Sequence, residues 1–258
     1  LGVQSLQPEI ARVLARGHNI RQAAQLLREV QNLGLRTWSA DLIFAVPGQN
    51  LTLLDRDLDA LIASNTPHIS LYGLSIEPGT PFHAMQKSGR IRLPDEDVWA
   101  ELFDRIRERL SHIGMEHYEI SNFAMKGHRS VHNSATWRGG HYVGLGPSAH
   151  GFTPDGGRWM NPADVETWLE SPPPPTEAPS PEAAAVDYLL STLRHIEGSD
   201  LRHLHAQTGL RPSESTIKTL IHGGLLKQEG PMLRLRPAGV ALADGIVQKL
   251  CESLAGIP

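Results

Sequence analysis

Three polar side chains in the first part of the chain have the types and positions to bind a small polar ligand. Gln4 ends a predicted strand, Arg16 lies at the end of the helix that follows, and Asp41 lies on the next predicted strand. A guanidinium pairs with carboxylates, a carboxylate accepts from ammonium or hydroxyl groups, and an amide both donates and accepts. The alternative is that Arg16 and Asp41 form an ion pair and bind no ligand.

Two other motifs limit the chemistry that the chain supports. The glycine-rich stretch 139–147 lacks the spacing of a phosphate-binding loop, and no Lys follows it, so it predicts tight turns. The single cysteine, Cys251, excludes a disulfide framework, a cysteine-held cluster and a cysteine-based zinc site within this chain. A lone cysteine is typical of a reducing compartment, and we expect a cytoplasmic protein.

The elements that must position these residues alternate in type along the first half. Strands are predicted at 1–4, 38–46, 68–74 and 117–120, and helices from 8 and at 20–33, 51–64 and 95–113. Strands spaced by about 30 residues predict parallel β/α units with right-handed crossovers. An open sheet and a barrel both satisfy this pattern, and both place ligands at the C-terminal ends of the strands.

The composition changes in the second half. Residues 121–153 are rich in Gly and His and show little periodicity, and residues 171–181 carry six prolines and predict an extended linker. Beyond the linker, the chain predicts a winged-helix-like module. Its elements are helices at 182–195, 200–207 and 213–222, a hairpin at 225–226 and 232–236, and a closing helix at 238–254.

Charge and hydropathy argue against two classes of partner. The 258 residues carry a formal net charge of −4, and the predicted recognition helix 213–222 has one Lys and one Glu, so we expect no nucleic-acid partner. No apolar run approaches the roughly 20 residues of a membrane span. His203 and His205 stand two apart on a predicted helix, do not share a face, and are expected to be solvated.

Four segments in order resemble the second half of HemW-type radical-SAM proteins, the heme-chaperone relatives of oxygen-independent coproporphyrinogen oxidase. They are GVQS (2–5), DLIFAVPGQ (41–49), LYGLSIEPGTP (71–81) and HNSATWRGGHYVGLGPSAH (132–150). HYEISNFA (117–124) and the GGLL of the last module (223–226) extend the resemblance over nearly the whole chain. Each segment alone is a weak signal, but the ordered set is specific.

The resemblance implies an α/β fold: the C-terminal part of an incomplete radical-SAM (β/α)6 barrel, followed by a small winged-helix-like α+β domain. We expect later β/α units at 1–124, a Gly/His-rich segment and barrel-covering loop at 125–170, the linker at 171–181 and the winged-helix-like domain at 182–258. In the family, the cysteine loop for a [4Fe-4S] cluster and a glycine-rich S-adenosyl-L-methionine segment come earlier. We therefore expect this chain to be a fragment that carries neither of them.

The family pattern also implies site residues. Gln4, Arg16, Asp41 and Ser75 match positions that contact S-adenosyl-L-methionine. The segment beginning at His132 resembles the HNxxYW motif associated with heme, with Thr136 in place of the Tyr. A neutral imidazole is a common axial ligand of heme iron, and a nearby aromatic ring can cover the porphyrin. The implied heme candidates are His132, Asn133, Trp137 and His150. His117, His128 and His141 are further candidates, each with a structural histidine as the alternative.

These implications favour a heme-binding radical-SAM family protein that hands heme to an acceptor protein. The alternatives are an oxygen-independent coproporphyrinogen III oxidase and a winged-helix regulator with a degenerate barrel. The GLGPSAH run and the HN…W segment favour the chaperone, and the weakly charged recognition helix counts against the regulator. Since the cluster would require cysteines that this chain does not have, we expect no radical chemistry from the fragment alone.

Overall fold

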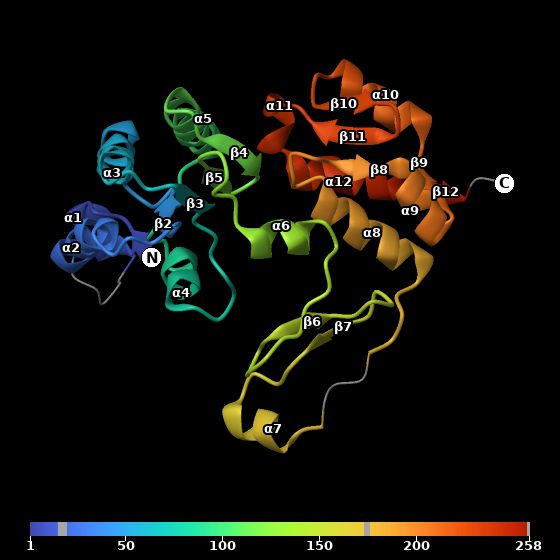
Figure 1. Ribbon diagram of the computed structural model, residues 1–258, viewed down its shortest axis with the longest axis horizontal. Helices are drawn as coiled ribbons and strands as arrows, with labels where there is room; N and C mark the ends of the chain where they lie inside the picture. Colours follow the sequence, from blue (N-terminus) through green and yellow to red (C-terminus); the bar gives the residue numbers. More distant parts are fainter. Residues whose placement is uncertain (15–19, 173–175, 257–258) are drawn as a thin grey trace. The chain divides into compact units, whose positions relative to one another are not determined.

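The computed structural model describes residues 1–14, 20–172 and 176–256. The chain forms two compact units, Leu1–Arg129 and Ser130–Pro258, which are called unit 1 and unit 2 below (Figure 1). Our finer division of residues 125–258 into three parts remains a prediction. None of the described helices is long and apolar enough to cross a membrane.

Unit 1 contains a sheet in which the strands stand in the order β1-β2-β3-β5-β4. The strands are β1 (Gly2–Gln4), β2 (Ser39–Phe44), β3 (His68–Gly73), β4 (Glu116–Glu119) and β5 (Asn122–Ala124). The first three are parallel, as predicted. The prediction was wrong beside β3, because the chain turns back after β4 and the short strand β5 inserts antiparallel between β3 and β4.

Five helices are described in unit 1. They are α1 (Pro8–Val13), α2 (Ile20–Gln31), α3 (Leu51–Ala63), α4 (Pro81–Lys87) and α5 (Glu96–His112). Side-chain caps fix several starts: Asn50 accepts from the backbone N–H of Leu53 at 3.0 Å, and Asp95 accepts from Val98 at 2.9 Å. The sequence prediction missed α4, although Thr80, Pro81 and the cap bond from His83 N–H to Thr80 Oγ1 give it an ordinary helix start.

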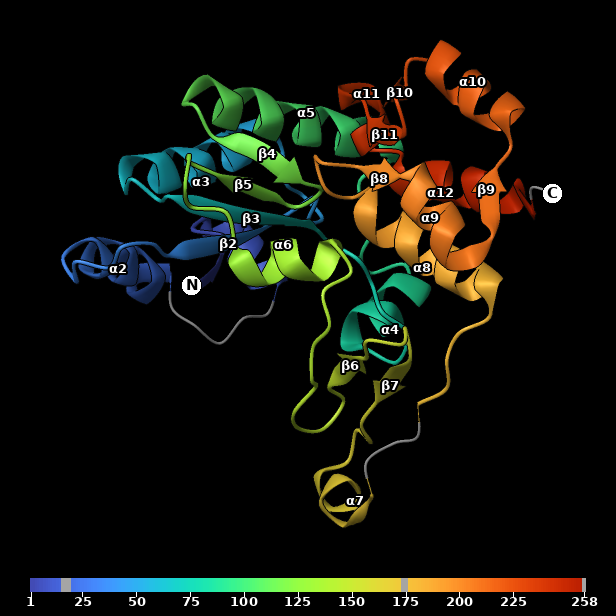
Figure 2. The same ribbon diagram turned by 45° about the vertical axis from the view of Figure 1, so that its right-hand side comes forward.

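The two faces of this sheet differ in chemistry. One face carries apolar side chains such as Leu42, Phe44 and Leu71, each at most 2% exposed. Phe44 packs against α5, with its ring centroid 5.3 Å from that of Trp99 and 6.0 Å from that of Phe103. Figure 2 shows α3 and α5 together on one side of the sheet. The burial of these rings therefore fixes which face of the sheet is left for polar residues.

Unit 2 is built from seven described helices and seven short strands. The helices are α6 (Val131–Trp137), α7 (Val165–Glu170), α8 (Pro181–Thr192), α9 (Leu201–Thr208), α10 (Glu214–His222), α11 (Pro237–Val240) and α12 (Ala243–Glu252). The strands are β6 (His150–Phe152), β7 (Arg158–Met160), β8 (Ser199–Asp200), β9 (Leu210–Pro212), β10 (Leu226–Glu229), β11 (Met232–Leu235) and β12 (Leu254–Gly256).

The core of unit 2 joins α8, α9, α10 and α12 to the β10–β11 hairpin. It includes Leu189, Leu204, Ile217, Leu233 and Leu250, all at most 1% exposed. Helices α8 to α10 and the hairpin form where the sequence predicted them, with ends shifted by a few residues. Three prolines of the predicted linker, 173–175, lie outside the described residues.

The prediction of one continuous closing helix at 238–254 was wrong. It is broken into α11 and α12, and its predicted end at Leu254 belongs to β12, which pairs with β9. The first turn packs so tightly on the hairpin that a Cβ added to Gly239 would stand 2.2 Å from the carbonyl oxygen of Leu225. This contact holds α11 in place, and the chain changes direction before α12 begins.

Candidate functional site

Strand register places a row of mostly polar residues across the sheet of unit 1. Paired positions run from Gly2 to Asp41, Ser70, Asn122 and Glu119. Laterally paired residues share a face of a sheet, so this row lies opposite the apolar face that packs on α5. Ser70, Asn122 and Glu119 are 3–4% exposed. The polar face of the sheet is therefore buried at β3, β5 and β4, whereas Asp41 on β2 is half-buried and Gly2 on β1 is exposed.

Gln4 joins this face through an unusual backbone conformation. Its φ of 66° lies in the left-handed region, which residues other than glycine seldom adopt, and the β1–β2 register shifts between Gly2 and Gln4. A Cβ added to Gly2 would stand 2.9 Å from Gln4 Nε2, so the amide of Gln4 folds over Gly2. Because Gly2 pairs with Asp41, the amide and the carboxylate lie on the same face.

Of the other two residues predicted to contact S-adenosyl-L-methionine, Arg16 and Ser75, the structure describes only Ser75. Arg16 lies outside the described residues, so the geometry neither joins it to Asp41 nor separates it. Ser75 is exposed in the loop that follows β3, at the same strand edge as Gln4. Of the four, the structure therefore brings Gln4 and Asp41 together and places Ser75 near the end of the next strand.

Two buried polar atoms on the polar face lack a hydrogen-bond partner among the described residues. One is Asn122 Oδ1, whose own Nδ2 donates to Glu119 Oε1, and the other is His68 Nδ1. Burial lowers the pKa of His68, while the nearby carboxylate of Asp41 acts to raise it. His68 Nε2 lies 2.8 Å from the hydroxyl of Tyr118. An unpaired buried acceptor beside a carboxylate fits a ligand with ammonium or hydroxyl donors, and S-adenosyl-L-methionine carries both.

The described residues do not fit an iron–sulfur cluster. Cys251, on α12, packs at the edge of the core of unit 2, and burial raises the pKa of its thiol. No three His, Cys, Asp or Glu side chains gather as metal ligands in the described part of the chain. One cysteine cannot supply the set of thiolates that holds a [4Fe-4S] cluster.

The predicted heme segment forms α6 of unit 2. Ser130 caps this helix by accepting from the backbone N–H of Asn133 at 3.1 Å. His132 is exposed, Asn133 and Trp137 are partly buried, and the guanidinium carbon of Arg194 lies 5.6 Å from the centroid of the Trp137 ring. His150 is exposed at the start of β6. The four predicted heme residues thus lie in one unit without forming one wall.

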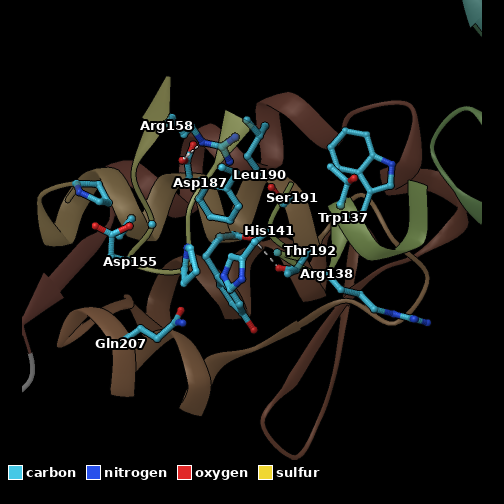
Figure 3. A pocket seen from close by; sticks show the side chains of 18 of the residues that line it. Trp137, Arg138, His141, Asp155, Arg158, Asp187, Leu190, Ser191, Thr192 and Gln207 are labelled. Atoms are coloured by element: carbon cyan, nitrogen blue, oxygen red, sulfur yellow. Dashed lines mark hydrogen bonds and ion pairs between the residues drawn. The ribbon is translucent and has the colours of Figure 1, made fainter. Parts of the chain in front are cut away.

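Unit 2 contains a cavity of about 740 Å³, a size typical of small-molecule sites. Its aromatic walls are Trp137 from α6, Tyr142 and Phe152 from the following strand region, and Tyr188 from α8. Figure 3 shows His141 between Trp137 on one side and the Arg158–Asp187 pair on the other. Of the predicted heme residues, Trp137 lines the cavity, whereas His132, Asn133 and His150 are not among its lining residues.

Two histidines line this cavity, His141 and His203. The ring of His141 lies 5.7 Å from that of Phe152, and the ring of His203 lies 5.4 Å from that of Tyr188, measured between centroids. His141 was one of several histidine candidates, but sequence reasoning missed His203. The spacing of His203 and His205 indicated their different faces correctly, but only the packing of α8 beside α9 shows that His203 meets an aromatic wall.

Two of the remaining histidine candidates, His117 and His128, make contacts that are typical of structural histidines. The ring of His117 stacks on Phe123 at 4.1 Å, its Nε2 lies 3.0 Å from the carbonyl oxygen of Ile120, and burial lowers its pKa to about 4. His128 Nδ1 lies 3.0 Å from Thr37 Oγ1. The prediction that His205 is solvated was wrong for its Nδ1, which is buried and has no hydrogen-bond partner among the described residues.

Comparisons with known proteins agree with this architecture. The chain is 32% identical to heme chaperone HemW of Mycobacterium tuberculosis over 256 residues, which cover 97% of this chain and 64% of that protein. It is 38% identical over 157 residues to the mitochondrial radical S-adenosyl methionine domain-containing protein 1 of Danio rerio, covering 60% of this chain and 35% of that protein. The chain thus spans between about one third and two thirds of the length of these relatives.

Among solved structures, the fold matches coproporphyrinogen III oxidase (HemN) from Escherichia coli, described as a radical SAM enzyme. The TM-score is 0.75 at 17% identity, over 98% of this chain and 63% of that chain. At this identity the likeness concerns the fold, and it confirms the predicted fold class. No model of a protein family matches the chain.

Proposed function

Because this chain belongs to the HemW-type family of radical-SAM proteins, we propose that it is the part of a heme chaperone that binds heme and hands it to an acceptor protein. The observation that carries the proposal is the similarity to HemW over 97% of the chain. The fold alone does not separate a chaperone from an oxidase, since the likeness to coproporphyrinogen III oxidase is a likeness of architecture.

The site geometry supports this proposal in two places. On the polar face of unit 1, Gln4 and Asp41 are proposed to contact S-adenosyl-L-methionine, with Ser75 at the strand end and Arg16 as further partners. The cofactor brings a carboxylate, an ammonium and a ribose diol, and amide and carboxylate oxygens accept hydrogen bonds from the last two. In unit 2, the segment that contains His132, Asn133 and Trp137, together with His150, is proposed to contact heme.

Titration of the 258-residue chain with ferric heme tests the proposal. We expect saturable binding with a shifted Soret band. If His132 ligates the iron, His132→Ala should weaken binding about tenfold or more, whereas the exposed His222→Ala should leave it unchanged. Hemin should also bind more tightly than metal-free coproporphyrin, because an imidazole adds a bond to iron. A chain that binds no hemin would refute the proposed function, and the reverse order of affinities would favour the oxidase.

A further inference from the structure

We propose that the cavity of unit 2 holds the porphyrin ring of heme and that His141 supplies an imidazole to its iron. This inference rests on the proposed function, from which the ligand class is taken. It adds an iron ligand beyond the HNxxYW-like segment. Trp137 of that segment lines the cavity, whereas His141 follows α6 and has neighbours in the cavity from β6, β7 and α8.

The walls of the cavity suit a flat, apolar macrocycle. Trp137, Tyr142, Phe152 and Tyr188 present aromatic surface, and aromatic rings stack on planar ligands. The volume of about 740 Å³ lies within the range of pockets that enclose cofactors. A macrocycle would bury this surface, which the described residues leave open.

Both guanidinium groups at the cavity already have acidic partners. Arg158 Nε lies 2.5 Å from Asp187 Oδ2, and the guanidinium carbon of Arg158 lies 4.4 Å from the centroid of the Phe152 ring. Arg138 pairs with Glu197, and Asp155 is a further carboxylate in the lining. The guanidinium groups can meet the carboxylates of a porphyrin, but they already have acidic partners. Aromatic contact and iron ligation therefore carry the recognition.

His141 is available as a ligand. Its side chain is exposed, and neither of its ring nitrogens makes a hydrogen bond within the described part of the chain. Its ring lies beside that of Phe152, and it is close enough to Asp155 to lower the pKa of that carboxyl. An imidazole with both nitrogens free can turn one toward iron, whereas His117 has one ring nitrogen engaged and lies in unit 1. His203 lines the same cavity and serves as the comparison residue.

The experiment titrates the 258-residue chain with hemin and, separately, with metal-free protoporphyrin. His141→Ala should weaken hemin binding about tenfold or more and change the Soret spectrum, and added imidazole should restore the spectrum. The same variant should leave metal-free porphyrin binding unchanged, because no iron bond is lost. Ala184→Trp should weaken both ligands, because Ala184 lines the cavity and a Trp there fills it.

The controls distinguish a failure of the cavity assignment from a failure of the proposed function. Ala183→Trp places the same ring on the neighbouring exposed position of α8, outside the cavity lining, and should bind both ligands normally. If the wild-type chain binds hemin but His141→Ala and Ala184→Trp bind it equally well, the cavity assignment is wrong and the proposed function stands. If His203→Ala, and not His141→Ala, abolishes the tighter binding of hemin relative to metal-free protoporphyrin, His141 is not the iron ligand. If the wild-type chain binds no hemin, the proposed function itself fails.

Discussion

At the scale of single residues, burial decides which polar groups are structural. Asp57 is 1% exposed and accepts from Ser5 Oγ, Leu6 N–H and Gln7 Nε2 at 2.7–2.9 Å. Burial raises the pKa of this carboxyl, and the three hydrogen bonds act in the opposite direction. The carboxylate ties the turn after β1 to α3, so it positions the strand that carries Gln4. His117 shows the same principle for an imidazole.

His117 should make the stability of unit 1 depend on pH. Burial lowers its pKa from 6.5 to about 4, so the folded state binds the proton less tightly than the unfolded state. The stabilising contribution is therefore complete above pH 6.5 and is lost as the pH falls toward 4. Between pH 7.5 and 5, the loss should be about 2 kcal/mol. His117→Phe, which keeps a ring beside Phe123, should remove this contribution to the pH dependence of the free energy of unfolding.

Urea unfolding at both pH values measures the effect, as the difference between wild type and variant. Carboxylates elsewhere titrate equally in both proteins and cancel in that difference. His112→Ala, at an exposed position at the end of α5 in unit 1, should retain the wild-type dependence. An unchanged pH dependence in His117→Phe would show that this imidazole does not titrate differently in the folded state.

At the scale of elements, close packing of glycine shapes the cavity wall. Gly151 of β6 pairs with Trp159 of β7, and a Cβ added to Gly151 would stand 1.9 Å from the Trp159 ring. The neighbouring residues on the two strands, Phe152 and Arg158, line the cavity. The indole therefore lies directly over the glycine, and this contact holds the hairpin that supports the wall.

Gly151→Ala should destabilise unit 2, because the indole must move away from its place over β6. We expect a loss of about 1–3 kcal/mol in the free energy of unfolding, together with weaker porphyrin binding. Gly245→Ala is the matched control, since Gly245 is exposed on α12 and an added Cβ meets nothing within 4 Å. The control should gain about 0.5–1 kcal/mol. Thermal unfolding of both variants measures these changes in stability. A Gly151→Ala protein as stable as wild type would contradict the packing argument.

At the scale of the whole molecule, the two proposed binding sites contrast with the absence, among the described residues, of a set of thiolates that could hold a cluster. The polar face of unit 1 and the cavity of unit 2 belong to different compact units. The sequence contains one cysteine, and it lies in unit 2. A radical reaction that begins with electron transfer from an iron–sulfur cluster therefore needs thiolates that these 258 residues do not contain.

Reconstitution of the chain with iron and sulfide should give no [4Fe-4S] absorption. Cys251→Ala should behave like the wild type, because one partly buried thiol does not hold a cluster. Iron and acid-labile sulfide analysis after gel filtration measures the outcome. A stoichiometric cluster on the wild-type chain would show that ligands other than cysteine thiolates hold it.

The sequence by itself determined the elements and the family. Apolar periodicity and capping residues such as Asn50 and Asp95 act over a few neighbouring positions, so helices and parallel strands were predictable from local pattern. The family pattern also indicated Gln4 and Asp41, and the register of β1 and β2 places both on the polar face of the sheet. Short elements without periodicity, such as β5, α6 and the β6–β7 hairpin, gave no comparable signal.

Only the tertiary structure decided which candidates share a site. The cavity depends on contacts between residues far apart in sequence, such as Arg158 with Asp187 and the His203 ring with Tyr188. No local pattern encodes such contacts, because they arise when separate elements pack into one core. For that reason the histidine-rich segment predicted several ligands, whereas packing placed His141 and His203 in the cavity and left His132 and His150 exposed outside its lining.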